Sequence, residues 1–224
     1  SEAIQELSPL FGPVTGGTTV TISGDFGASG RIDVTFGNSP AVVATRESDK
    51  SIRCEVPAVD RVGPVLVQIK QNGIALTSAG SLAFENVYPI EMQKLVPTAG
   101  PTSGGTPVVV VAKYFARAQS NDWELLCRFG VLRVPATVIN DTAVMCLTPR
   151  LAEGKVAVSL SNNGGVDFTE ALAYTATRQM QLFDIKPSSG PLSGGTRVTL
   201  SGADFFKSDS LTCLFNDTAV HATI

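Results

Sequence analysis

One short phrase occurs three times in this sequence and sets limits on what the chain can fold into. It reads Gly-Pro, two variable residues and then Gly-Gly-Thr, and it occupies residues 12–18, 100–106 and 190–196. The glycine pairs that begin at Gly16, Gly104 and Gly194 are 88 and 90 residues apart. This spacing is too long for a solenoid unit and fits a whole small domain. The sequence therefore predicts two complete repeats and the front of a third.

The phrase itself predicts a rigid corner that leads into a strand. Proline fixes φ and cannot donate to a strand ladder, and the glycine pair permits positive φ. Runs rich in β-branched residues follow each corner, at 18–22, 106–111 and 196–200. Further short segments alternate between apolar and polar residues, and Asn72-Gly73 and the Asn-Asn-Gly-Gly run at 162–165 indicate hairpin turns. We predict an all-β fold of tandem antiparallel sandwiches.

Charge and hydropathy exclude several functional classes. The formal net charge is −3 and no Lys or Arg cluster exists, so we expect no nucleic-acid partner. No stretch of about 18 apolar residues is present, so we expect membrane contact only through parts of a parent protein outside this segment. The third repeat reaches Ile224 about half a domain after its corner. Because half a sandwich leaves open strand edges, we expect the sequence to be a segment of a longer protein.

The repeats share more than their corners. Each has a proline before the phrase, a Phe after the first strand and an aromatic strand further on, and the first two also share a Phe-Gly pair and a Cys-x-x-Pro stretch. The matching residues are Pro9, Phe26, Phe36-Gly37 and Cys54–Pro57, then Pro97, Phe115, Phe129-Gly130 and Cys146–Pro149, and then Pro187, Phe205 and Phe215.

In this order the residues resemble the IPT/TIG domain, an immunoglobulin-like sandwich. The resemblance implies domains at residues 1–89, 90–177 and 178–224, the third of them truncated. Two departures stand out: the second repeat has Ala112-Lys113 where the others have Ser-Gly, and the third has Asn216 where the others have glycine. Such domains occur in plexins, in the hepatocyte growth factor receptor, in large protist and algal surface proteins and in a few transcription factors.

Cysteine positions give the most specific expectation within this framework. Cys127 and Cys146 lie on strands that can face each other in a sandwich, and we predict a disulfide between them. Cys213 matches Cys127, with its expected partner beyond Ile224. Cys54 matches Cys146, but Val34 stands where its partner should be, so Cys54 is expected to be a buried free thiol. The alternative is that all four are core thiols in a reducing compartment.

Two sequons, Asn140-Asp141-Thr142 and Asn216-Asp217-Thr218, lie in turn-like stretches and are candidates for N-glycans. His221 is the sole histidine, and the carboxylates are scattered singly, so we predict no catalytic, metal or cofactor site and no enzymatic activity. Trp123 is expected on a core or edge strand rather than as an exposed contact residue.

The predicted function is structural and adhesive. The chain is interpreted as part of an extracellular or cell-surface receptor or adhesion protein, whose domains act as spacers and bind other proteins. Copies of the chain itself are possible partners through exposed sheet edges. The alternatives are a repeating block of an extracellular filament or appendage, an accessory module of a secreted carbohydrate-active enzyme, and a nuclear protein of the same family.

Overall fold

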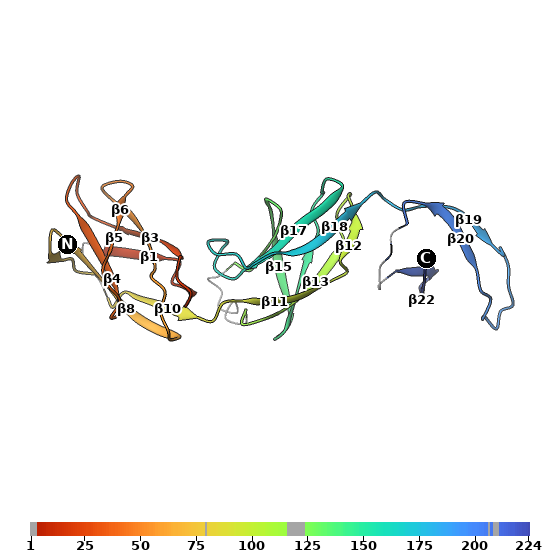
Figure 1. Ribbon diagram of the computed structural model, residues 1–224, viewed down its shortest axis with the longest axis horizontal. Coiled ribbons are helices and arrows are strands. Elements are labelled where there is room, and N and C mark those ends of the chain that lie inside the picture. The colour runs from red at the N-terminus through yellow and green to blue at the C-terminus, as the bar shows by residue number, and fades with distance from the viewer. Residues whose placement is uncertain (1–3, 79, 116–123, 206, 208–210) are drawn as a thin grey trace. The chain divides into compact units, whose positions relative to one another are not determined.

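The structure is a computed structural model that describes residues 4–78, 80–115, 124–205, 207 and 211–224. Within these ranges every regular element is a β-strand, as Figure 1 shows. The all-β prediction is therefore confirmed. Trp123 lies outside the described residues.

The first repeat forms two facing sheets. One sheet has the strand order β1-β3-β7-β6, and the other has the order β2-β10-β8-β4-β5, with β9 paired to β8. The strands are β1 (Ile4–Ser8), β2 (Phe11–Pro13), β3 (Thr19–Gly24), β4 (Ile32–Phe36), β5 (Val42–Val43), β6 (Thr45–Arg46), β7 (Ser51–Glu55), β8 (Gly63–Gln71), β9 (Ile74–Ala75) and β10 (Ala83–Val87).

The hairpin predicted at Asn72-Gly73 is confirmed. Gln71 of β8 pairs with Ile74 of β9, and the two residues between them have φ values of 51° and 82°. Positive φ at both central positions is the conformation for which Asn-Gly is favoured.

The three corners have one geometry. The N–H groups of Gly16, Gly104 and Gly194 each donate to the carbonyl oxygen of the proline three residues earlier, at 3.0–3.1 Å. All three glycines, and the glycine after each, have φ between 73° and 84°. A Cβ would also collide with nearby backbone at two of these glycines: at Gly16 with residues 57–58, and at Gly104 with residues 148–149. All three corners therefore favour glycine for its φ, and the first two also require it for close packing.

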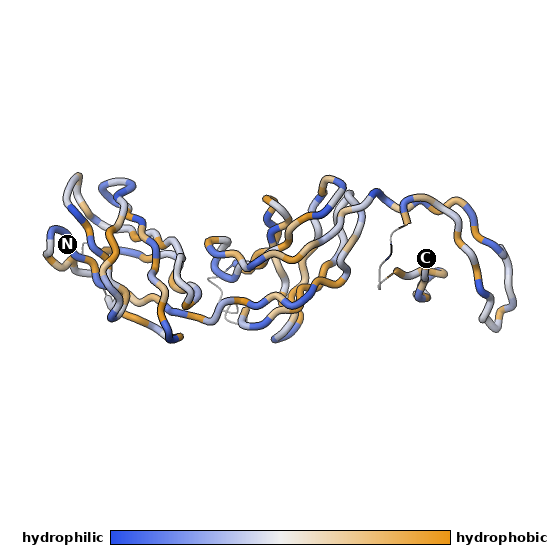
Figure 2. The backbone as a smooth tube through the Cα atoms, viewed as in Figure 1, coloured by the Kyte–Doolittle hydropathy of each residue, from blue (hydrophilic) through white to orange (hydrophobic). Residues whose placement is uncertain are grey.

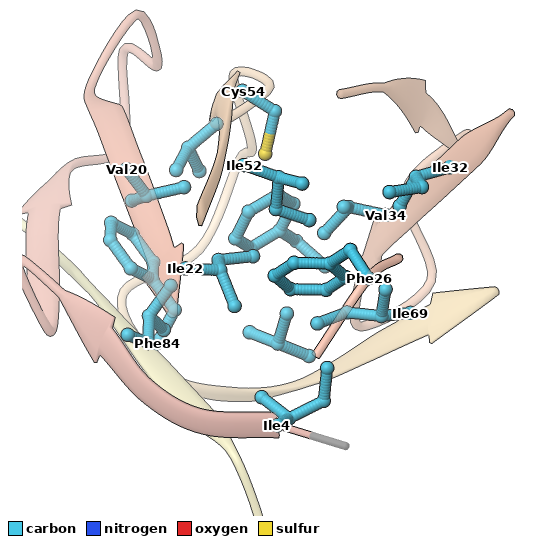
Figure 3. Packing of buried hydrophobic residues seen from close by; sticks show 14 residues of the cluster. Ile4, Val20, Ile22, Phe26, Ile32, Val34, Ile52, Cys54, Ile69 and Phe84 are labelled. Carbon is cyan, nitrogen blue, oxygen red and sulfur yellow. The ribbon is translucent and has the colours of Figure 1, made fainter. Parts of the chain in front are cut away.

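The core of the first sandwich lies between its two sheets. Figure 3 shows side chains from β1, β3, β4, β7, β8 and β10 gathered around Phe26, with Cys54 at one border of the cluster. Phe36 and Phe84 pack edge to face with ring centroids 5.7 Å apart. Figure 2 shows hydrophobic and hydrophilic residues alternating along many strands, the pattern that places one face of a strand in a core.

The second repeat has the same order of elements in one continuous sheet path. The order is β11-β13-β16-β15-β14-β17-β18-β12, and the long strand β15 pairs with β16 on one side and β14 on the other. The strands are β11 (Glu91–Val96), β12 (Ala99–Pro101), β13 (Pro107–Lys113), β14 (Leu126–Phe129), β15 (Leu132–Asn140), β16 (Ala143–Leu147), β17 (Gly154–Ser161) and β18 (Leu172–Thr177).

Tyr174 replaces Phe84 as the core aromatic residue of the second sandwich. Its ring packs edge to face on Phe129, with centroids 5.9 Å apart, and the side chain is fully buried. Its hydroxyl lies against Gly100, where an added Cβ would collide with it. Burial raises the pKa of Tyr174, and the Thr106 and Thr148 side chains partly offset the rise. The extra hydroxyl therefore fills space that this glycine leaves open.

The turn predicted at 162–165 belongs to a longer connection. β17 and β18 pair from Gly154↔Ala176 to Val158↔Leu172, so the connection extends from the end of β17 to Leu172. Asn163 Oδ1 accepts hydrogen bonds from the Ser161 hydroxyl and from the Asp167 backbone N–H, at 3.1 and 2.9 Å. Side-chain bonds of this kind compete with ladder pairing and hold the wider loop in shape.

The third repeat begins in the same way. β19 (Gln181–Lys186) pairs with β20 (Thr199–Ala203), and β21 (Thr212–Phe215) pairs with β22 (Thr218–His221). Asn216, in the turn between β21 and β22, has a φ of 50°, close to the 58° of Gly37 and the 62° of Gly130. Asparagine tolerates this left-handed conformation better than other non-glycine residues, which explains how it replaces glycine here.

Candidate modification sites and interaction surfaces

A disulfide joins Cys127 of β14 to Cys146 of β16, with their Cα atoms 6.3 Å apart. β14 and β16 do not pair with each other, because β15 lies between them in the strand order. Both cysteines are buried, at 0% and 1% exposure. The bond therefore crosses the core of the second sandwich and closes a separation of 19 residues.

The two other cysteines are free within this chain. Cys54 is buried, and burial raises the pKa of its thiol to about 12. A thiol with such a high pKa is protonated at neutral pH and behaves as a small apolar core residue. Cys213 on β21 is partly exposed.

Both sequon asparagines are exposed and lie at turns. Asn140 ends β15, and its Oδ1 accepts hydrogen bonds from the Thr142 backbone N–H at 2.9 Å and from the Thr142 hydroxyl at 3.1 Å. This is an Asx-turn, in which an asparagine side chain mimics a backbone turn. Asn216 occupies the hairpin in which Phe215 pairs with Thr218. The structure therefore leaves both side chains accessible from solvent.

In the part of the chain that the structure covers, no three His, Cys, Asp or Glu side chains are grouped so that they could hold a metal ion. Asp25 forms an exposed ion pair with Lys50, at 3.2 Å, and the lysine lowers the pKa of the Asp25 carboxyl. Across the same described ranges, no helix is long and apolar enough to cross a membrane.

Open strand edges are the first kind of candidate interaction surface. β1 ends one sheet of the first sandwich, and β11 and β12 end the strand path of the second. Unpaired backbone groups on such strands can accept a strand from a partner.

A second kind of surface was not anticipated from the sequence. On the outer side of β13 and β16, away from the core, the exposed or half-exposed residues are apolar up to Lys113 at the end of β13: Pro107, Val109, Val111, Met145 and Leu147. We call these five residues the outer apolar face. The signal was present in the continuous apolar run at 107–112, which lacks the alternation seen at 18–23.

These structural features are those of an immunoglobulin-like repeat protein, and comparison with known proteins names the family. The sequence model of the IPT/TIG domain matches residues 3–85, 90–176 and 182–223. The chain belongs to this family, with three tandem matches.

Named relatives agree with that assignment. The chain is 28% identical to mouse fibrocystin-L over 209 residues, which is 92% of the chain and 5% of fibrocystin-L. It is 30% identical to mouse plexin-A2 over 150 residues, which is 66% of the chain and 8% of plexin-A2. The chain thus spans less than a tenth of either relative.

One solved structure is similar over nearly the whole chain. It is the full extracellular region of plexin A4, with a TM-score of 0.52, 18% identity, and coverage of 99% of this chain and 19% of that one. At this level of identity the likeness supports the fold.

Proposed function

We propose that this chain is a non-enzymatic segment of the extracellular part of a larger cell-surface protein. Its immunoglobulin-like domains, at residues 1–89, 90–177 and 178–224, act as spacers and present surfaces to other proteins. The tandem arrangement and the similarity to fibrocystin-L and plexin-A2 support this role. The small share of each relative that is covered fits a segment within a much longer chain.

The observation that carries the proposal is the geometry of Cys127 and Cys146. Two buried cysteines brought within bonding distance across a core favour an oxidising compartment, where disulfides form and persist. The exposed sequons at Asn140 and Asn216 fit the same compartment, and we propose that at least one of them carries an N-glycan.

Protein partners are proposed to bind at the strand edges and through the loops at the ends of the sandwiches. Repetition of one fold suits spacing, because each of the first two sandwiches has its own buried core. We propose no nucleic-acid partner, because the net charge is −3 and the sequence has no basic cluster.

The test uses the parent protein in the cells that express it. Intact cells are labelled with a membrane-impermeant amine reagent, and peptides from residues 1–224 are analysed by mass spectrometry. The proposal predicts labelled lysines from this segment before permeabilisation. Labelling that is seen only after permeabilisation contradicts it.

A further inference from the structure

The outer apolar face lies in regular rows across the strands of the second sandwich. Val109 pairs with Met145, and Pro107 pairs with Leu147, between β13 and β16. Residues directly opposite each other in an antiparallel pair lie on the same side of the sheet, with Cβ atoms about 5 Å apart. Val108 and Cys146, which also pair with each other, are buried on the other side. The apolar rows therefore face away from the core.

The fold does not require this side to be apolar, because the first repeat has polar residues in the same rows. There Thr21 pairs with Arg53 and Thr19 pairs with Glu55, in place of the Val109–Met145 and Pro107–Leu147 pairs. In the third repeat Thr199 and Ser201 take the positions of Val109 and Val111, and both are exposed. Among the described residues, these rows are therefore apolar in the second repeat and polar at the matching positions of the other two.

Asn140 lies on the same side as these apolar residues. It pairs with Ala143, and Ala143 pairs in turn with Val111, so the three form one row across β15, β16 and β13. A β-bulge between Val138 and Asn140 produces this placement. The extra residue, Ile139, shifts the alternation by one and returns Asn140 to the outer side.

The second repeat has both the Asn140 sequon and the outer apolar face, and the first repeat has neither. The segment of the first repeat that corresponds to 140–142 contains no sequon, and its outer rows are polar. The other sequon begins at Asn216, in a turn between different strands. Asn140 Oδ1 is held by Thr142, whereas Nδ2, the atom that accepts a glycan, has no hydrogen-bond partner among the described residues.

We propose that the N-linked glycan on Asn140 lies over the outer apolar face and shields it from water and from other copies of the chain. The inference rests on the proposed extracellular function, because it needs passage through a glycosylating compartment. The apolar C–H faces of the first sugar rings pack on Val109, Val111 and Met145, while their hydroxyl groups stay in water.

The modification is a group transfer to the Asn140 side chain. The donor is an oligosaccharide linked through a diphosphate to a lipid carrier. A bond forms between Nδ2 and C1 of the first sugar, and the C1–O bond to the diphosphate breaks. The diphosphate leaves with the electron pair, and Nδ2 loses one proton.

The size of the face favours a glycan over a stable protein partner. Two strands about 4.8 Å apart and five residues at about 3.4 Å each cover roughly 160 Å². A standard protein interface buries about 800 Å² on each partner. A bare patch of this size is smaller than the few hundred Å² of apolar surface that monomers commonly expose, so bare copies are expected to associate only weakly and at high concentration.

The experiment uses the extracellular part of the parent protein that contains residues 1–224, secreted from cultured animal cells. Thr142→Ala removes the sequon and keeps Asn140, and Asn216→Gln is the matched control that removes the other sequon. Mass spectrometry gives the occupancy of each asparagine, light scattering after size exclusion gives the solution mass, and a dye that binds exposed apolar surface reports on the face. Thr142→Ala is expected to increase dye fluorescence and, at high protein concentration, to add larger species to the monomer, whereas Asn216→Gln leaves both unchanged.

A second variant tests whether the outer apolar face causes the added dye binding and association. On the Thr142→Ala background, Val109→Thr and Val111→Ser introduce the residues that the first repeat has in these rows, and they are expected to restore the monomer and the low dye signal. Retention of the Cys127–Cys146 link in every variant shows that the fold is intact.

The contrary outcomes distinguish failure of the glycan inference from failure of the proposed function. A secreted, disulfide-linked chain with bare Asn140 overturns the inference and leaves the proposed function standing. An occupied Asn140 also overturns the inference if loss of its glycan in Thr142→Ala changes neither dye fluorescence nor the association state of the chain. An occupied chain that still associates through Val109 and Val111 identifies the face as a protein-docking surface and also overturns the inference. A chain with reduced cysteines that is not secreted overturns the proposed function itself.

Discussion

Val34 on β4 and Cys54 on β7 are both buried in the core of the first sandwich, at the positions that Cys127 and Cys146 hold in the second. Figure 3 shows both side chains in the same cluster. The first repeat thus has only one of the two cysteines that form the disulfide in the second repeat.

Val34→Cys is expected to create a second disulfide, with Cys54. The loop closed is about the size of the native one, so the chain-entropy estimate is a gain of about 3 kcal/mol in unfolding free energy. Peptide mapping without reduction should find the 34–54 link, and the gain should disappear on reduction. Val34→Ala, which leaves a cavity without a bond, is the control and should only destabilise. Absence of the link would show that the two repeats differ in core geometry.

Removal of the native disulfide is expected to destabilise the second sandwich. In the chain with both Cys127→Ala and Cys146→Ala, the unfolding free energy should fall by about 3 kcal/mol, because the unfolded chain is no longer constrained. Denaturant unfolding measures the change, and Cys213→Ser, which breaks no bond in this chain, is the control. Equal stability of the doubly substituted chain and the control would contradict the expectation.

Gly100 and Tyr174 are expected to behave as a coupled pair. Gly100→Ala places a methyl group against the Tyr174 hydroxyl and the Thr106 side chain, and it should cost roughly 1–3 kcal/mol of stability. Tyr174→Phe, which introduces the aromatic residue of the first repeat, should recover part of that cost in the double variant. A double-mutant cycle measures the coupling. Additive costs would show that the hydroxyl is not the group in the way.

The buried thiol of Cys54 predicts a loss of stability at high pH. Its pKa is raised to about 12 in the folded chain by burial, whereas an unfolded cysteine ionises near pH 8.5–9. The folded state therefore holds its proton longer, and the stability that this gives is present below pH 9 and is lost as pH rises toward 12. Relative to Cys54→Ala, the chain should lose roughly 2 kcal/mol more between pH 9 and pH 11. Parallel curves for the two chains would contradict the raised pKa.

Sequence patterns anticipate the corners and strands well, because the residues that specify them act locally. The glycine pair at Gly16 and its two copies can meet the required φ without strain, and Asn72-Gly73 specifies its hairpin in the same way. The class of fold and the matched cysteine positions follow from repetition of these local signals.

The outer apolar face could not be read from the sequence in the same manner. The run from Val108 to Val111 is apolar throughout, so its pattern does not say which side is covered. The bulge at Ile139, which decides the side on which Asn140 lies, depends on pairing with β16. The long connection after β17 depends on side-chain bonds of Asn163, where Asn-Asn-Gly-Gly predicted a short turn.

Peptide mapping of the natively expressed protein, by mass spectrometry without reduction, tests the extracellular proposal most directly. The account predicts a peptide in which Cys127 is linked to Cys146, together with a glycan on Asn140 or Asn216. Four reduced cysteines and two bare asparagines would contradict it and would direct the search to a partner inside the cell.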